Sequence, residues 1–169
     1  MVEVTAERGY AAASLTEVLR RARVSRESFY QQFSSKEDCF MAAFETAVEV
    51  VLGEAFGEVS QEGAAIDRFN NGLRAYLDAM ARRPAFARVF LIEVYAAGPA
   101  ALRRRSELQT RFVGALDEIF GYRAPEERFA NEAVVAAASA MVTARLAVGD
   151  VDGVRALFEP LSWMSARLR

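Results

Sequence analysis

Residues 14–40 read SLTEVLRRARVSRESFYQQFSSKEDCF, and the fold class of the chain follows from this stretch. Three helix starts are packed into it, and each is marked by a serine. Ser14 is followed three residues later by Glu17, which is the spacing of a capping box, and Ser35 has an aspartate at the same distance. Ser25 suits the N-cap of a short helix between them. The stretch therefore predicts two short helices followed by the start of a third.

Apolar side chains in this stretch recur at the spacing of one helix face. They form two stripes: Leu15, Val18, Leu19 and Ala22 in the first helix, and Phe29 and Phe33 in the second. Val24 lies in the turn between the two stripes. Two short helices that share a small core across a tight turn form a helix-turn-helix motif.

The outer face of the second helix is polar. With the phenylalanines turned inward, the side chains left pointing outward are Arg26, Ser28, Tyr30, Gln31 and Gln32. Such donors and acceptors can contact base edges and phosphates in DNA. A solvated face is the usual interpretation of a short polar helix, but the combined order of caps, turn and aromatic residues favours a helix that reads DNA.

The pattern around this motif resembles the DNA-binding domain of the TetR family of transcriptional regulators. The recognition helix of that family carries an aromatic–tyrosine pair and a later phenylalanine, and its fourth helix begins with Ser-Lys-Glu. The matching residues here are Gly9 and Tyr10, Phe29, Tyr30 and Phe33, and Ser35, Lys36 and Glu37. Beyond Phe40 the chain agrees with the family in length and helical character. Family members diverge from one another in this part of the chain.

The resemblance implies a role for each polar residue of the motif. The side chains expected to face base edges are Arg26, Ser28, Gln31 and Gln32. Those expected to hold phosphates are Tyr30, Lys36, Ser14 and Thr16, the last two at a helix N-terminus.

Two residues of the motif depart from the family pattern. Arg23 occupies a turn position that is usually glycine, so the turn is expected to be looser or the arginine to reach phosphate. Glu27 occupies a position that usually has a small residue, and its carboxylate could accept a hydrogen bond from cytosine or repel the DNA.

The composition is that of a globular chain without a strongly charged surface. Of its 169 residues 53% are hydrophobic and 26% are charged, and the net charge at pH 7 is −2. This length is enough for one or two small domains with a sizeable core. The arginines around the turn, namely Arg20, Arg21, Arg23 and Arg26, form the kind of local basic patch that phosphate contact needs.

Cys39 is the one cysteine of the chain, which excludes an internal disulfide and fits a reducing cytoplasm. It lies beside Phe40 on the apolar side of its helix and is expected in the core. No apolar run approaches the length of a membrane span, and no signal peptide is recognised. The predicted location is therefore the cytoplasm, away from membranes.

No strand pattern or internal repeat interrupts the helical periodicity, so the predicted fold class is all-α. An N-terminal three-helix helix-turn-helix domain is expected over 1–44, with a short first helix ending at Gly9, and a C-terminal helical ligand-binding and dimerisation domain over 45–169. After a break at 53–63, helices are expected over 66–83, from Pro84 to just before Gly98, over 100–120, over 125–148, and over 154–168 with a bend at Pro160.

The last two of these helices suit an interface. Residues 133–141 are small on most helix faces, so other helices can approach closely on more than one side. The resemblance implies that the two helices pair with their copies in a homodimer, and the alternative is that they are internal core. Dimerisation has an independent argument, because one short recognition helix binds weakly whereas a two-fold pair reads two half-sites.

The sequence argues against an enzyme. It has no histidine, which excludes Ser-His and Cys-His nucleophiles and histidine metal sites, and it has no glycine-rich phosphate loop. Glu93, among apolar neighbours, is the one carboxylate considered for acid–base work, and pairing with an arginine such as Arg88 is the more common arrangement. No catalytic residue, metal or cofactor is predicted.

The resemblance also implies a pocket among the central helices, whose small-molecule ligand moves the DNA-binding heads. The supply of aromatic residues suits a small apolar ligand, although each residue taken alone is more often core. The candidate lining residues are Phe69, Tyr76, Met80, Phe86, Phe90, Tyr95, Phe112 and Phe120.

The predicted function is a homodimeric repressor that binds a palindromic operator in double-stranded DNA and is released by its ligand. Two alternatives stay open at this point. One is a DNA-binding regulator of the same fold that activates or takes no ligand. The other is a helical interaction protein whose DNA head has degenerated.

Overall fold

The computed structural model describes residues 1–56 and 63–168, and every regular element in that part of the chain is a helix. The elements are α1 (Val2–Arg8), α2 (Leu15–Ala22), α3 (Arg26–Gln32), α4 (Lys36–Phe56), α5 (Ala65–Arg82), α6 (Pro84–Leu91), the 3₁₀ helix η1 (Glu93–Ala96), α7 (Pro99–Phe120), α8 (Pro125–Ala147), α9 (Val151–Ala156) and α10 (Phe158–Arg167). The predicted all-α fold is confirmed. Residues 57–62 of the predicted break lie outside the described residues.

The N-termini of α2, α3 and α4 are capped by serine side chains, as the sequence predicts. Ser14 Oγ accepts a hydrogen bond from the Glu17 backbone N–H at 3.2 Å. Ser25 and Ser35 accept in the same way from the N–H three residues later, each at 3.0 Å. Each cap satisfies a donor that a helix start otherwise leaves unpaired, so these local features fix where the three helices begin.

The head, meaning α1, α2, α3 and the first turns of α4, has a small core of its own. Leu19 of α2, Phe29 of α3 and Cys39 of α4 pack together. Phe33 packs against them, with 5.4 Å between its ring centroid and that of Phe29. Cys39 is free and buried, which confirms its predicted place in the core, and burial raises the pKa of its thiol.

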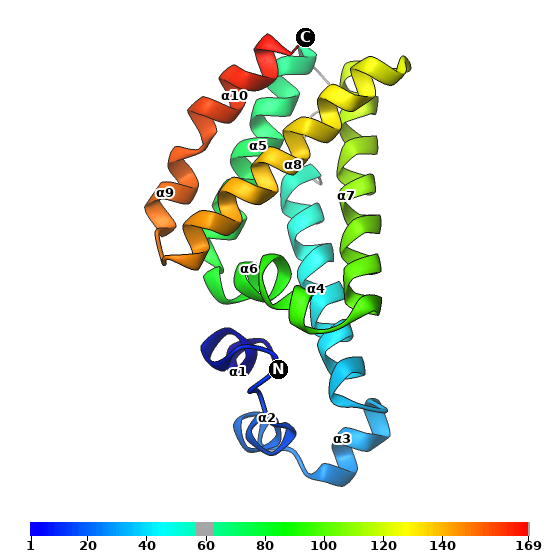
Figure 1. Ribbon diagram of the computed structural model, residues 1–169, viewed down its shortest axis with the longest axis vertical. Coiled ribbons are helices and arrows are strands. Elements are labelled where there is room, and N and C mark those ends of the chain that lie inside the picture. Colours follow the sequence, from blue (N-terminus) through cyan, green and yellow to red (C-terminus); the bar gives the residue numbers. More distant parts are fainter. Residues whose placement is uncertain (57–62, 169) are drawn as a thin grey trace.

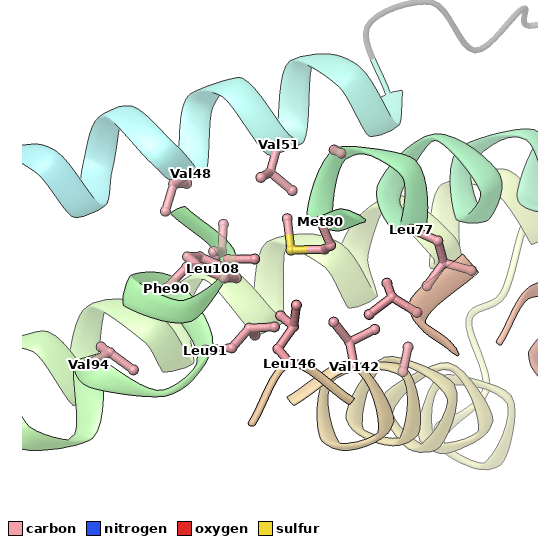
Figure 2. Close-up of a cluster of buried hydrophobic side chains, with 14 of the residues drawn as sticks. Val48, Val51, Leu77, Met80, Phe90, Leu91, Val94, Leu108, Val142 and Leu146 are labelled. Carbon is pink, nitrogen blue, oxygen red and sulfur yellow. The ribbon is translucent and has the colours of Figure 1, made fainter. Parts of the chain in front are cut away.

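The long helix α4 joins the head to the body, meaning α5 to α10 (Figure 1). Beyond Cys39 its inward side chains belong to the core of the body: Phe40, Phe44, Val48 and Val51. Figure 2 shows Met80 of α5 between Val51 of α4 and Leu146 of α8. One helix therefore contributes to the cores of both head and body.

The helix that begins at Pro84 is shorter than predicted. α6 ends at Leu91, and η1 follows. The N–H groups of Tyr95 and Ala97 bond to carbonyls three residues back, at 3.3 Å each, which is the winding of a 3₁₀ helix. Apolar spacings of three and four do not separate this winding from an α-helix, so the prediction of one helix up to Gly98 is wrong after Leu91.

Two other boundaries differ from the prediction. α4 continues through Gly53 to Phe56, so the break begins later than expected. The predicted last helix is divided at Leu157 into α9 and α10. The division lies three residues before Pro160, where the bend is predicted, because Pro160 has no N–H to bond to the carbonyl of Ala156, the last residue of α9.

Candidate DNA-contacting face and ligand cavity

α3 presents a polar face at the end of the head that lies away from the body (Figure 1). Of its residues, all of which the structure describes, Phe29 is the one that is buried. The side chains predicted to point outward are all exposed: Arg26, Ser28, Tyr30, Gln31 and Gln32. Arg26, Gln31 and Gln32 make no hydrogen bond or ion pair with a described residue, so their polar atoms are available to a partner.

Ser28 and Tyr30 are held in place by the head itself. Ser28 Oγ shares a hydrogen bond with Ser25 Oγ at 2.9 Å. The ring of Tyr30 meets Phe29 edge-on with 5.4 Å between centroids, and Tyr30 is still 51% exposed. Packing therefore fixes the position of these two side chains on the outer face before any DNA binds.

Ser14 and Thr16 are exposed at the start of α2, where the sequence predicts phosphate contacts. The first turn of a helix has unpaired backbone N–H groups and the positive end of the helix dipole, which together favour a phosphate. The Ser14 hydroxyl already accepts from Glu17 as the cap, and its proton is still available to a phosphate oxygen.

Lys36 is placed differently from the other predicted phosphate ligands. Its Nζ donates to the backbone carbonyl oxygens of Tyr10 at 2.9 Å and Ala13 at 3.1 Å. It also lies 4.2 Å from the centroid of the Tyr10 ring. Two of the three ammonium protons are thus engaged within the head, and this geometry favours a role in tying the α1–α2 connection to α4.

The arginines around the turn are not equivalent. Arg21 makes a two-pronged ion pair with Glu7, at 2.6 and 2.7 Å, which lowers the pKa of the Glu7 carboxyl. Arg20, Arg23 and Arg26 are exposed and pair with no described residue. The basic patch therefore consists of these three, because Arg21 is already neutralised by α1.

The body encloses a cavity between α5, α6, α7 and α8. The volume in which the centre of a water molecule fits is about 80 Å³. The wall is formed by Phe69, Gly72, Leu73, Tyr76, Phe90, Leu91, Arg105, Leu108, Gln109, Phe112, Leu116, Ile119, Val134, Val135, Ala138 and Ser139. Four of the residues proposed from the sequence, Phe69, Tyr76, Phe90 and Phe112, lie on this wall.

The other four proposed lining residues lie off the cavity wall. Met80 is in the core at 2% exposure, and Tyr95 is 57% exposed on η1. Phe86 is half-buried on α6, and Phe120 packs on Phe69 with 5.9 Å between ring centroids. Helical spacing identifies an inward side chain, but it does not tell whether that side chain meets other core residues or a void.

Three polar side chains of the wall were missed at the sequence level: Arg105, Gln109 and Ser139. Arg105 donates to Ser139 Oγ at 3.0 Å and to Gln109 Oε1 at 3.4 Å. Burial raises the pKa of the neighbouring Tyr76 hydroxyl, and the charge of Arg105 offsets part of that rise. The available signal was the spacing of Arg105 and Gln109, four apart, which places both on the inward face of α7 beside Leu108.

Glu93 of η1 links the body to the head. It is 8% exposed, and its Oε2 accepts a hydrogen bond from the backbone N–H of Tyr10 at 2.8 Å. Its other oxygen lies 3.4 Å from Arg88 Nε, so the predicted Glu93–Arg88 pair is confirmed. Phe90 and Leu91 of the preceding helix lie on the cavity wall. Only a few residues therefore separate the cavity from the contact with the head.

Head and body are joined by one long helix. The helix-turn-helix head exposes its second helix, and α4 connects it to a body that holds a mostly apolar cavity. Residues 2–43 match the family model described as bacterial regulatory proteins, tetR family. The head of this chain is therefore similar to the DNA-binding part of that family.

Solved structures share the fold over nearly the whole chain. FadR, a fatty acid degradation regulator from Bacillus halodurans, has a TM-score of 0.83 at 18% identity, covering 97% of this chain and 92% of its own. FadR from Bacillus subtilis, solved in complex with stearoyl-CoA, has a TM-score of 0.84 at 17% identity, with the same coverages of 97% and 92%. A TetR-like regulator from Rhodococcus sp. RHA1 has a TM-score of 0.78 at 19% identity, covering 98% of this chain and 91% of its own.

A comparison with curated proteins by sequence finds no match. None of the described helices is long and apolar enough to cross a membrane.

Proposed function

We propose that the protein is a cytoplasmic, homodimeric repressor that binds a palindromic operator and leaves it when a ligand with an apolar body fills the cavity. The observation that carries this proposal is the short structural path from the cavity wall, through Phe90 and Leu91, to the Glu93–Tyr10 bond at the head. A ligand that moves α6 acts directly on the support of the DNA-binding head.

The proposed DNA binding is supported by the exposed face of α3. Arg26, Gln31 and Gln32 offer their polar atoms to base edges, and the exposed start of α2 offers backbone N–H groups to a phosphate. A single such head contacts few bases, so specific binding calls for two heads on successive major-groove faces. The operator is accordingly a palindrome.

The proposed homodimer is supported by apolar side chains that are exposed on the last helices. Phe129 is 69% exposed, Val148 78% and Trp163 62%, and Met141 and Leu168 are 40% and 47% exposed. Phe129 and Met141 lie on α8, and Trp163 lies on α10. Val148 and Leu168 are the residues that directly follow these two helices. Several large apolar side chains exposed on neighbouring helices are typical of a protein–protein interface, and two copies related by a two-fold axis would cover them.

The proposed binding of a ligand with an apolar body is supported by the wall of the cavity, which is mostly aromatic and aliphatic. Because FadR from Bacillus subtilis was solved with stearoyl-CoA, a fatty acyl chain is the first ligand to test. The mechanism is a population shift: the ligand must bind better to the head arrangement that does not fit the operator, and operator binding must weaken ligand binding by the same factor.

Deletion of the gene in its host, followed by sequencing of the transcripts, tests the proposal. A repressor predicts that a small set of transcripts rises on deletion and falls again when the wild-type gene is restored. Restoration with Arg26→Ala should leave those transcripts raised, because the DNA-contacting face is impaired. Transcripts that fall on deletion would instead identify an activator, which is the alternative of the same fold.

A further inference from the structure

The polar side chains of the cavity wall lie together at one place. Arg105 reaches across from α7 to Ser139 of α8 at 3.0 Å and along its own helix to Gln109 at 3.4 Å. Tyr76 of α5 is on the same wall and is close enough for the charge of Arg105 to lower the pKa of its hydroxyl. The rest of the wall is almost entirely apolar.

Arg105 has no anionic partner among the described residues. Its hydrogen bonds are to neutral oxygens, and its Nε is buried without a hydrogen-bond partner. The face of the Tyr95 ring lies 5.1 Å from the centre of the guanidinium, which is a further neutral contact. Arg105 is half-buried and has no counter-charge beside it, so an anion bound at this place would gain a favourable charge–charge contact.

We infer that Arg105, with Ser139 and Gln109, receives the anionic head group of an amphiphilic ligand whose apolar body fills the remainder of the cavity. The inference rests on the proposed ligand-responsive function and names the class of ligand: an organic acid with a long apolar body. A carboxylate and a phosphate share the chemistry that this group of donors recognises.

The geometry of the donors supports an anion over a neutral polar group. The guanidinium presents its N–H groups as a planar fork, and an oxyanion can take two of them side by side. Its two terminal nitrogens each donate one hydrogen bond, to Gln109 and to Ser139, and each has a second N–H that can be offered to an oxyanion. The Ser139 hydroxyl and the neutral Tyr76 hydroxyl can donate as well, whereas no acidic side chain is on the cavity wall.

The apolar remainder sets the other half of the ligand. Phe69, Leu116, Ile119 and Val134 come from three helices and line the cavity with apolar side chains. Burial of the apolar body against these side chains contributes affinity but does not orient the ligand. The bond between the charged head group and Arg105 sets the orientation of the ligand in the cavity.

Matched ligand pairs test the inference by direct calorimetric binding to the DNA-free protein. Decanoic acid and 1-decanol have the same apolar body and differ in the charged head, and decyl phosphate separates a phosphate from a carboxylate. Decanoic acid, decyl phosphate or both should bind the wild type about tenfold or more tightly than decanol, as expected for a charge-assisted bond. Equal binding of all three, or no saturable binding by acids from hexanoic to stearic, would overturn the inference.

Variants on one helix supply the control. Arg105→Met should lose the preference for the charged head while it keeps decanol binding. Arg103→Met removes the same charge from an exposed position of α7 off the cavity wall and should keep the preference. If Arg105→Met melts well below the wild type, Arg105→Gln takes its place, and a preserved preference in a folded Arg105 variant overturns the inference.

The two proposals can fail separately. Selective binding of the charged ligands without release of operator DNA would leave the ligand class standing and refute the release mechanism. Release of the operator by decanol as readily as by decanoic acid would leave the release mechanism standing and refute the ligand class.

Discussion

Arg23 adopts the left-handed backbone geometry that its turn requires, although it is not a glycine. Its φ is 57°, in the left-handed region, and it is the one non-glycine residue with a positive φ in the described part of the chain. A side chain in that region costs about 1–2 kcal/mol, whereas glycine adopts it freely. The turn is therefore not loosened by the arginine, and the backbone keeps the conformation that glycine would have.

Replacing Arg23 by glycine should raise the free energy of unfolding by up to about 1 kcal/mol, since relief of strain exceeds the entropy that glycine adds to the unfolded chain. Urea denaturation measures this change. Arg20→Gly, which removes the same charge from the exposed face of α2, should instead lower stability by about 1 kcal/mol. Equal destabilisation by both variants would show that Arg23 is unstrained.

For Lys36, the resemblance implies contact with a DNA phosphate, whereas the structure supports a role in holding the head together. A phosphate ligand predicts that its loss weakens binding to every DNA sequence and flattens the salt dependence by about one unit per half-site. Its bonds to two backbone carbonyls predict that Lys36→Met lowers the free energy of unfolding by about 1–3 kcal/mol. A stable Lys36→Met protein with a flattened salt dependence would restore the phosphate role.

Among the helices, α3 is the one that is proposed to contact the bases of DNA. Arg26→Ala should relax preference at one operator position, at a cost of about 1–3 kcal/mol there, without changing the melting temperature. The reason is that Arg26 is exposed and pairs with no described residue. Competition binding to operator variants with single base changes measures it, and an unchanged base preference would mean that Arg26 reads no base.

The η1 segment carries the link between body and head. Glu93→Ala removes the acceptor of the Tyr10 N–H, so hydrogen exchange at that amide should accelerate by about tenfold or more. The control is Glu107→Ala, which removes an exposed carboxylate paired with Arg104 on α7. Unchanged exchange at Tyr10 would show that the head is held by other contacts.

The helix boundaries show which elements were predictable from sequence. The starts of α2, α3 and α4 depend on serines that bond within their own first turn, so the pattern predicted them correctly. The position of Glu93 involves Tyr10, which lies far away in the sequence, and periodicity carries no such information.

The cavity shows the same division between local and distant information. Four of the eight proposed lining residues lie on the wall and four lie elsewhere, because whether an inward side chain meets a void depends on how helices pack. Arg105 was missed because an arginine in a helix pattern is normally taken as surface. Its spacing with Leu108 and Gln109 on one face was the available evidence.

On the scale of the whole molecule, head and body are joined by α4, by the packing of α1 on α6, and by the bond between Glu93 and Tyr10. α4 contributes to both cores, and Glu93 bonds to Tyr10 beside the Lys36 contacts. A change in the cavity can therefore reach the head through α6 and through α4. In the proposed dimer, these connections would couple ligand binding to the spacing of the two heads.

The most direct test is binding of the wild-type protein to a library of genomic fragments at two salt concentrations, with sequencing of the retained DNA. The account predicts enrichment of a short palindrome and a steep loss of binding at the higher salt concentration, because a dimer displaces counterions from several phosphates. No enrichment by folded, dimeric protein would contradict the account and favour a degenerate DNA head.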